Sequence, residues 1–330
     1  MKTVQFNKLG GPEVLQVIKQ EIPFPADHEV VIKVKAAGLN QAEQLFFQGQ
    51  YLFQPQFPST LGFEASGIVE KVGANVNEFR PGDEVCLTPN IMPYEYGYLG
   101  EYVLAPKEAV IHKPASVSFE EGAAFWMTYG TAYGGLVLRG KLQAGQTVLI
   151  TAGSSGVGIA AIQMARHLGA RVITTTRTSS KKEFLEKQGA DLVIVTTEDS
   201  LIEQVREFTD DKGFQLAFDP IAGTFLSEIA EAAAMEAHIV LYGVLSLELD
   251  APFPLFPTFA KGLHYSGLHL MFHVLQHPDR FEAMKDALLK GLEQGAYTPV
   301  IDKKFVLDQV KEAYEYMQSN QQQGKILGTI

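Results

Sequence analysis

The stretch from Val148 to Ala160 carries residue types and spacing that suit a bound phosphate group. A strand-forming run leads into small residues, and helical periodicity follows from Gly158. Small side chains let the backbone approach a pyrophosphate, and a helix N-terminus offers free N–H groups and the positive end of its dipole. The stretch approximates the GxGxxG pattern, with serine at the middle glycine. A tight turn that binds nothing is the alternative. The residues expected to contact a dinucleotide are Gly153, Ser154, Ser155, Gly156, Val157 and Gly158.

The end of the next expected strand indicates which dinucleotide would bind. An NAD site carries Asp or Glu there, about 20 residues beyond the loop, to hold the ribose 2′-OH. This chain has no acid at that place, where Thr176 is followed by Arg177, and Lys181 stands at the start of the next expected helix. A guanidinium group suits a phosphate. The sequence therefore predicts NADPH, held in part by Thr176, Arg177 and Lys181, although a solvated turn with an incidental basic cluster would look the same.

The elements around this loop alternate regularly between strand and helix. That alternation predicts a parallel sheet with helices on both faces. Residues 1–115 differ, because short β-branched runs such as Val30–Ala36 are separated by Gly and Pro turns, which favours a compact barrel. The expected strands after residue 145 are Thr147–Thr151, Arg171–Thr175, Leu192–Val195, Phe214–Phe218, His238–Leu241 and Leu263–Leu270. The expected helices are Gly158–Leu168, Lys181–Gln188, Leu201–Phe208, Phe225–Ala234 and Asp279–Gln294.

Composition excludes several classes of protein. At 330 residues the chain is long for one core, so two domains are expected. Its net charge of -11 disfavours nucleic acid as a partner. Cys86 is the single cysteine, which excludes a disulfide within the chain and a multi-cysteine zinc site. The N-terminus has no apolar signal region, and the uncharged stretch Ala123–Leu138 is too short and polar to span a bilayer. We therefore expect a cytoplasmic protein without a membrane anchor.

Three histidines recur at a spacing that could suit a metal ion. His269, His273 and His277 recur every four residues and would share one face of a helix. No carboxylate completes the set at matching spacing, and the same stretch also fits the end of a strand. We therefore expect no metal site.

Several motifs across the chain identify a family. None of the 12 tyrosines has a lysine four positions later, so the YxxxK pair of short-chain dehydrogenases is missing. The chain resembles instead the medium-chain dehydrogenases/reductases, and within them the zinc-independent quinone oxidoreductase branch. The motifs that carry this resemblance, in the family's order, are Ala36–Asn40, Gly62–Val69, Val72-Gly73, Pro81–Val85, Gly100–Val103 and Gly324–Ile326.

The resemblance implies a fold and excludes zinc. It implies a Rossmann doubly wound parallel sheet inserted into a GroES-like β-barrel catalytic domain, with the active site in the cleft. The expected boundaries are 1–122 for the GroES-like domain, completed by 271–330, and 123–270 for the NADPH-binding domain. Zinc members carry a Cys ligand where this chain has Asn40, and Gly-His-Glu where it has Gly62-Phe63-Glu64. Tetrahedral catalytic zinc would therefore lack its ligands.

The resemblance also implies roles for residues outside the loop. Asn40 is expected to orient substrate or cofactor, and Tyr51 matches a tyrosine that donates a proton to a developing enolate. Thr131, Tyr242-Gly243 and Lys325 match stretches near the cofactor. Turn chemistry or ordinary packing fits each of these residues as well.

The function expected from the resemblance is NADPH-dependent hydride transfer to a quinone or an α,β-unsaturated carbonyl. Phenylalanines after Asn40 favour a small apolar substrate, whereas Leu45 replaces an aromatic hydroxyl of some quinone reductases. An enoyl thioester reductase of the same superfamily and a non-catalytic NADPH-binding scaffold are the alternatives. The family also implies a homodimer, formed through the strand expected near Leu263–Leu270.

Overall fold

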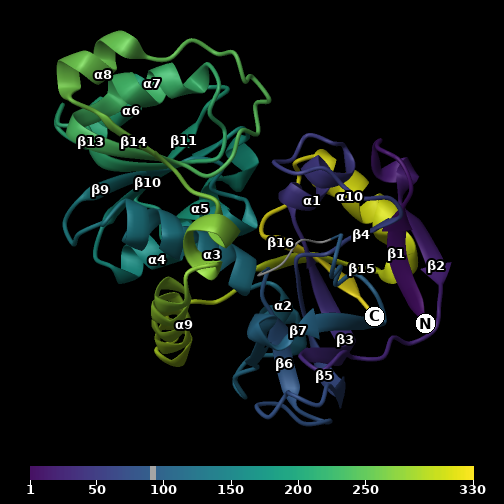
Figure 1. The fold of residues 1–330 in the computed structure, drawn as a ribbon. Coiled ribbons are helices and arrows are strands. Elements are labelled where there is room, and N and C mark those ends of the chain that lie inside the picture. Colours follow the sequence, from purple (N-terminus) through teal and green to yellow (C-terminus); the bar gives the residue numbers. More distant parts are fainter. Residues whose placement is uncertain (90–93) are drawn as a thin grey trace. The chain divides into compact units, whose positions relative to one another are not determined.

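The computed structural model describes residues 1–89 and 94–330 (Figure 1). The chain forms two compact units. The first, here the split unit, comprises Met1–Met127 and Pro299–Ile330. The second, here the inserted unit, comprises Thr128–Thr298. The expected insertion of one unit into the other is thus confirmed.

The inserted unit is built on a six-stranded parallel sheet. Its strands are β9 (Thr147–Ile150), β10 (Arg171–Thr176), β11 (Leu192–Val195), β12 (Phe214–Asp219), β13 (Ala233–Leu241) and β14 (His264–Gly267). They lie in the order β11-β10-β9-β12-β13-β14. The order reverses between β9 and β12, which is the switch point where open α/β sheets bind ligands at the carboxyl ends of their strands.

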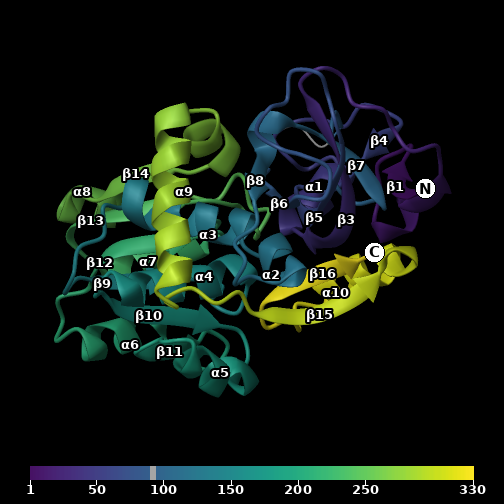
Figure 2. The same cartoon turned by 90° about the horizontal axis from the view of Figure 1, so that it is seen from below.

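Both faces of this sheet are covered, which explains why every residue of its central strand β9 is buried. On one face, Leu149 of β9 packs in a core cluster with Val205 and Ile229, from helices α6 (Leu201–Phe208) and α7 (Phe225–Ala232) (Figure 2). On the other face, a Cβ at Gly135 would collide with the Phe218 ring, because the π-helical turn that contains Gly135 lies directly on β12. The remaining helices of the unit are α4 (Gly156–His167), α5 (Lys182–Lys187), α8 (Leu255–Lys261) and α9 (Pro278–Glu293), while α3 (Trp126–Tyr133) begins just before it.

The split unit holds two sheets, and strands from both ends of the chain meet in the larger one. The strands are β1 (Lys2–Phe6), β2 (Gln16–Lys19), β3 (Glu29–Leu39), β4 (Ser59–Thr60), β5 (Glu64–Val72), β6 (Glu84–Leu87), β7 (Tyr102–Pro106), β8 (Val110–His112), β15 (Ile301–Val306) and β16 (Lys325–Thr329). One sheet has the order β2-β1-β4, and the other has β15-β16-β3-β5-β6-β8, with β7 also paired to β3. Its helices are α1 (Gln41–Phe47), α2 (Phe119–Ala123) and α10 (Val310–Gln318).

The C-terminal segment belongs to the core of the split unit. Strand β16 pairs antiparallel with β3, so that Leu327 lies opposite Gly38. Tyr314 and Met317 of α10 are buried in the same apolar cluster as Phe6 from β1. The N-terminal part of the chain therefore needs its C-terminal end to complete one core.

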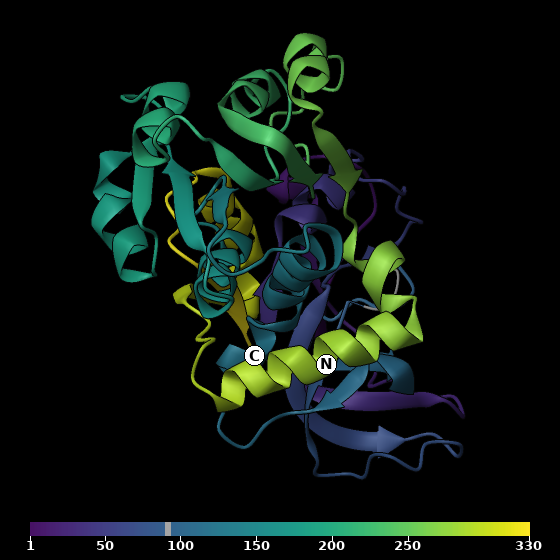
Figure 3. The same cartoon turned by 90° about the vertical axis from the view of Figure 1, so that its left-hand side faces the viewer.

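The structure differs from the expected domain boundaries at the point where the chain leaves the inserted unit. We expected the chain to return to the split unit after residue 270, whereas it returns after Thr298. The intervening helix α9, the long yellow-green helix of Figure 3, packs inside the inserted unit. A Cβ at Gly130 in α3 would lie 3.1 Å from Met284 Sδ of α9, which shows how closely the two helices approach.

Most expected elements of the inserted unit are confirmed. Leu192–Val195 and Leu201–Phe208 have the expected bounds. The helix expected to reach Ala234 ends at Ala232, because β13 begins at Ala233. The last strand is shorter than Leu263–Leu270, since a π-helical turn starts at Met271. Among the described residues, no helix is both long and apolar enough to cross a membrane.

Candidate functional site

The loop after β9 turns tightly into α4. Ser155 is the N-cap of α4, and its Oγ accepts a hydrogen bond of 3.0 Å from the Gly158 N–H. A Cβ at Gly158 would lie 2.5 Å from the Ala152 carbonyl oxygen, and one at Gly153 would collide with the Thr174 hydroxyl. The two glycines are therefore required by packing, and the N-terminus of a 12-residue helix opens beyond them.

The end of β10 brings one of its two basic residues onto this loop. Lys181 is buried, and its Nζ donates a hydrogen bond of 3.2 Å to the Ser154 hydroxyl. Arg177 is exposed, with its backbone oxygen bonded to Thr197 at 2.8 Å. Thr176 is buried beside them, and its Oγ1 accepts a weak 3.4 Å bond from the Thr178 N–H. Of the predicted basic residues, Lys181 thus contacts the loop, whereas Arg177 is exposed.

Tyr242 and Gly243 follow β13 directly; the Tyr242 side chain meets Ser155 of the same loop, and Gly243 lies against Pro220. The Tyr242 ring stacks on Phe218, with centroids 4.0 Å apart and planes 19° apart. Its hydroxyl is buried, and no described residue meets it with hydrogen-bond geometry, although the Ser155 hydroxyl interacts with it. Burial and the nearby Asp219 raise the pKa of this phenol. The hydroxyl is thus a protonated donor beside the N-cap of α4.

Asp219, at the end of β12, is a residue that sequence reasoning missed. Its carboxylate accepts hydrogen bonds from the Thr151 hydroxyl, from the Ile221 N–H at 3.2 Å and from the Ala222 N–H at 2.7 Å. Burial raises its pKa. It joins the loop after β9 to the turn after β12, the two segments at the switch point. An acid directly after an apolar run and before Pro220 was the available signal.

Thr131 lies in α3 and is buried, with 7 % of its surface exposed. It is the remaining candidate of the inserted unit. The other three candidates, Asn40, Tyr51 and Lys325, belong to the split unit.

Asn40 and Lys325 contact each other, although 285 residues separate them along the chain. Lys325 Nζ donates to Asn40 Oδ1 at 2.5 Å and forms an ion pair of 2.5 Å with Glu64 Oε1. Asn40 Nδ2 donates to the Gly38 carbonyl at 3.1 Å. Lys325 and Glu64 have side-chain exposures of 5 % and 0 %. Lys325, expected to contact the cofactor, thus forms a buried network within the split unit.

Glu43 forms the second half of this network and was not among the expected site residues. Its carboxylate accepts hydrogen bonds from the Tyr314 hydroxyl at 2.6 Å, from the Phe63 N–H at 2.7 Å and from the Asn40 N–H at 2.8 Å. Burial raises its pKa, and these donors together with Lys325 oppose the shift. Glu43 therefore holds the start of α1, α10 and the segment before β5 together. An acid three residues after an Asn at a helix start, as in a capping box, was the signal.

Tyr51 lies in the turn after α1, where it is half-buried. Its ring packs edge-on against Phe53 at 4.9 Å and is tilted over Phe63 at 6.1 Å. Burial and the Glu43 carboxylate raise the pKa of the phenol well above its usual value. The group is therefore protonated at neutral pH, which a proton donor requires, but it is also a weaker acid than a free phenol.

The histidines that recur every four residues do not form one helical face. The His269 N–H donates to His273 Nδ1 at 3.0 Å, and a π-helical turn over Met271–Leu275 follows His269. Burial lowers the pKa of His269 to about 4. Across the described residues 1–89 and 94–330, no group of three or more His, Cys, Asp or Glu side chains is arranged to hold a metal ion.

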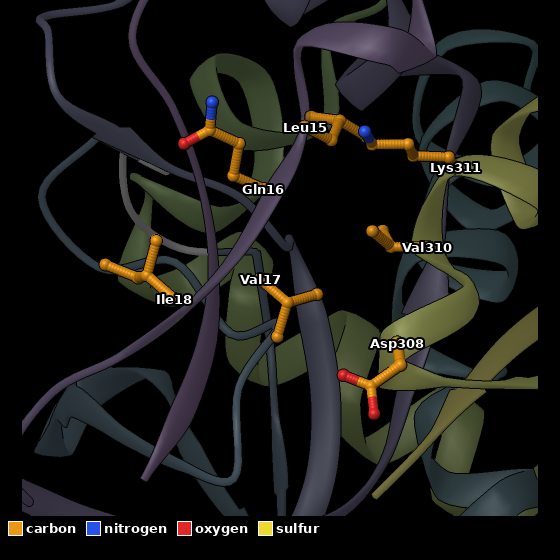
Figure 4. Close-up of a pocket in the computed structure, with 7 residues that line it drawn as sticks. All are labelled: Leu15, Gln16, Val17, Ile18, Asp308, Val310 and Lys311. Carbon is orange, nitrogen blue, oxygen red and sulfur yellow. The ribbon is translucent and has the colours of Figure 1, made fainter.

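A shallow hollow on the split unit lies apart from all the candidate residues. Its volume is about 420 Å³, and it lies between β2 and the start of α10 (Figure 4). Its lining residues are Leu15, Gln16, Val17, Ile18, Asp308, Val310 and Lys311.

Comparison with known proteins identifies both units. Residues 26–115 match the alcohol dehydrogenase GroES-like domain, and residues 156–290 match the family described as zinc-binding dehydrogenase. Human quinone oxidoreductase is 31 % identical over 317 residues, which cover 96 % of this chain and 93 % of the human protein. Quinone oxidoreductase 1 of Escherichia coli is 35 % identical over 223 residues, which cover 66 % of this chain and 65 % of that protein.

Solved structures agree with these sequence relatives. The E. coli quinone oxidoreductase complexed with NADPH superimposes with a TM-score of 0.90 at 27 % identity, covering 100 % of both chains. The CurK enoyl reductase superimposes with a TM-score of 0.88 at 25 % identity, covering 99 % of this chain and 98 % of its own. The predicted fold class, a Rossmann sheet inserted into a GroES-like domain, is confirmed. The chain therefore belongs to the quinone oxidoreductase family of the medium-chain dehydrogenases/reductases.

Proposed function

We propose that this protein is an oxidoreductase that uses NADPH to reduce quinones or α,β-unsaturated carbonyls without a zinc ion. The observation that carries the proposal is the loop between β9 and α4, with basic side chains at the end of β10 and no carboxylate there. The NADPH complex of the related E. coli enzyme supports the same cofactor.

The residues of the inserted unit suit both the pyrophosphate and the 2′-phosphate of NADPH. Gly153 and Gly158 let the loop pack closely against Thr174 and Ala152, and α4 presents its N-terminal amides beyond them. Lys181 and the exposed Arg177 suit the 2′-phosphate that distinguishes NADPH from NADH. The buried Tyr242 hydroxyl is a donor for a ligand group at the same loop. When bound, the cofactor supplies the hydride; the chain supplies position and a proton.

The split unit would act on the substrate. Hydride addition to the β-carbon of an enone leaves an enolate, which must gain a proton at its α-carbon. We assign that proton to the Tyr51 hydroxyl, because a phenol is protonated at neutral pH and Tyr51 matches the tyrosine to which the family resemblance gives this role. Solvent would then reprotonate the phenolate. A quinone needs less help, since its reduced anion is stabilised and water can protonate it.

The donor set of the split unit argues for chemistry without zinc. At the positions where zinc members carry ligands, this chain has Asn40 and Phe63, and neither is a thiolate or an imidazole. The Asn40 amide oxygen already accepts the Lys325 ammonium at 2.5 Å. A cation beside that ammonium would be repelled by it.

The test is an NADPH-oxidation assay with a panel of quinones, enals, enones and an enoyl thioester, run beside a binding titration of NADPH and NADH. We expect turnover with quinones or enones and tighter binding of NADPH. Tight NADPH binding without any turnover would favour a scaffold protein. Turnover confined to the thioester would favour an enoyl thioester reductase, the chemistry named in the CurK relative.

We further propose that two copies of the chain associate through β14. This strand ends the six-stranded sheet and pairs only with β13 among the described residues, so its outer backbone groups are available to another strand. The neighbouring α8 has no buried residue and exposes Leu255, Phe256 and Phe259 at 72 %, 79 % and 85 %. Large apolar side chains gathered in this way are typical of an interface. The F256D/F259D variant should sediment as a monomer with unchanged circular dichroism; an unchanged sedimentation coefficient would contradict this interface.

A further inference from the structure

Gln163, on α4, has a side-chain amide with every hydrogen-bonding position in use. Its Oε1 accepts from the Tyr129 hydroxyl at 2.6 Å and from the Thr298 N–H at 2.9 Å. Its Nε2 donates to the Thr298 carbonyl at 3.1 Å and to Gln188 Oε1 at 3.0 Å. An amide offers two acceptor positions and two donors, so these four bonds satisfy it completely.

Two partners of this amide, Tyr129 and Thr298, lie at the two ends of the inserted unit. The chain enters the unit after Met127, and Tyr129 follows two residues later. The chain leaves the unit after Thr298. Gln163 bonds both the N–H and the carbonyl of Thr298, in the way that one strand bonds another. A single side chain of α4 thus holds both connecting segments.

Packing around the amide leaves these segments little freedom. The Tyr129 ring is 1 % exposed and lies 5.2 Å from the Tyr297 ring. The Tyr297 ring also meets the His167 ring, at 5.5 Å between centroids, and a Cβ at Gly291 would collide with the Tyr297 ring. The Gln163 amide supplies the polar bonds within this aromatic cluster.

We propose that Gln163 is a positioning residue that sets the place of Thr131 relative to a dinucleotide bound at the N-terminus of α4. Thr131 stands two residues after Tyr129 in α3, and Gln163 stands two helical turns after the loop on α4. The amide therefore links the pyrophosphate end of the site to the segment expected near the nicotinamide. This inference rests on the proposed cofactor, and it assigns a role to a residue that contacts neither cofactor nor substrate.

The decisive variants are Gln163→Leu, which keeps the volume and removes all four bonds, and Gln163→Glu, which keeps the two accepted bonds and removes the two donated ones. Gln188→Ala is the matched control, because it removes one bond of Gln163 but neither bond to Thr298 nor the bond to Tyr129. In the free protein, Gln163→Leu should speed hydrogen exchange of the Thr298 amide by at least about tenfold, while Gln188→Ala leaves it unchanged.

Two further readouts separate positioning from a merely structural role. Gln163→Leu should leave the Kd for NADPH within about threefold of the parent but shift the fluorescence of the bound nicotinamide, and it should lower kcat at least about tenfold. Gln163→Glu should fall between the parent and Gln163→Leu. Faster exchange with unchanged fluorescence and kcat would overturn the positioning role, and unchanged exchange would overturn the anchor itself. If the parent protein binds no NADPH, the proposed function fails, whereas the exchange measurement still decides whether Gln163 anchors the segments.

Discussion

The candidate residues of the two units differ in what their polar atoms contact. In the split unit, Lys325 bonds both Asn40 and Glu64, and all three residues are buried. In the inserted unit, Arg177 is exposed, and the buried Tyr242 hydroxyl interacts with the Ser155 hydroxyl at the loop. The polar atoms of the buried network are bonded to the protein's own atoms, whereas Arg177 offers N–H donors to an anion.

This difference indicates which property each group controls. A buried ion pair costs a great deal to break, since removing one partner leaves a desolvated charge. An exposed cation contributes little to folding but adds to the binding of a phosphate. Substitutions in the split unit should therefore lower stability or turnover, and substitutions around the loop should lower cofactor affinity.

The largest effect should follow from breaking the buried network of Asn40, Lys325 and Glu64. Lys325→Met leaves the fully buried Glu64 carboxylate without its ammonium partner, so we expect the free energy of unfolding to fall by about 3–5 kcal/mol. Urea denaturation at neutral pH measures this. The E64Q/K325M double variant should recover part of the loss, because no charge then remains unpaired. Lys187→Met, which breaks an exposed pair with Glu183, is the matched control and should be silent. A loss for Lys325→Met no larger than for this control would contradict a closed network.

An intermediate effect should come from Tyr51, which lies beside the buried network. Tyr51→Phe should lower enone turnover by about 10²-fold, because the ring remains and the transferable proton is lost. Quinone turnover should fall less, and NADPH affinity should stay the same. Steady-state kinetics with both substrate classes on one preparation measures this. If enone turnover were unchanged, solvent would be the proton source and Tyr51 a packing residue.

The smallest effect should come from Arg177, the exposed basic residue after β10. Arg177→Ala should weaken NADPH by about tenfold or more, since a charge-assisted contact contributes about 1.5–3 kcal/mol. NADH, which lacks the 2′-phosphate, should bind as before. The free energy of unfolding should also stay unchanged. Titration calorimetry with both cofactors measures the contrast. Equal losses for the two cofactors would mean that Arg177 supports the loop rather than the phosphate.

The sequence by itself determined the features that depend on neighbours along the chain. Strand runs such as Leu192–Val195 follow from local periodicity, and the strand, loop and helix around Gly153 and Gly158 lie within one short stretch, so both were predictable. The absence of an acid after β10 is also a local fact. These features indicated the fold of the inserted unit and its cofactor.

Only the tertiary structure decided which distant residues meet. Lys325 reaches Asn40 across 285 residues, and Tyr314 reaches Glu43 across 271. The chain returns to the split unit after Thr298 rather than after residue 270, because Met284 of α9 packs against α3. Periodicity along α9 does not reveal this contact. Burial and long-range pairing depend on how the whole chain closes on itself, and no window of neighbouring residues contains that information. The partners of Lys325 and the role of Glu43 therefore became visible only when both ends of the chain met in one core.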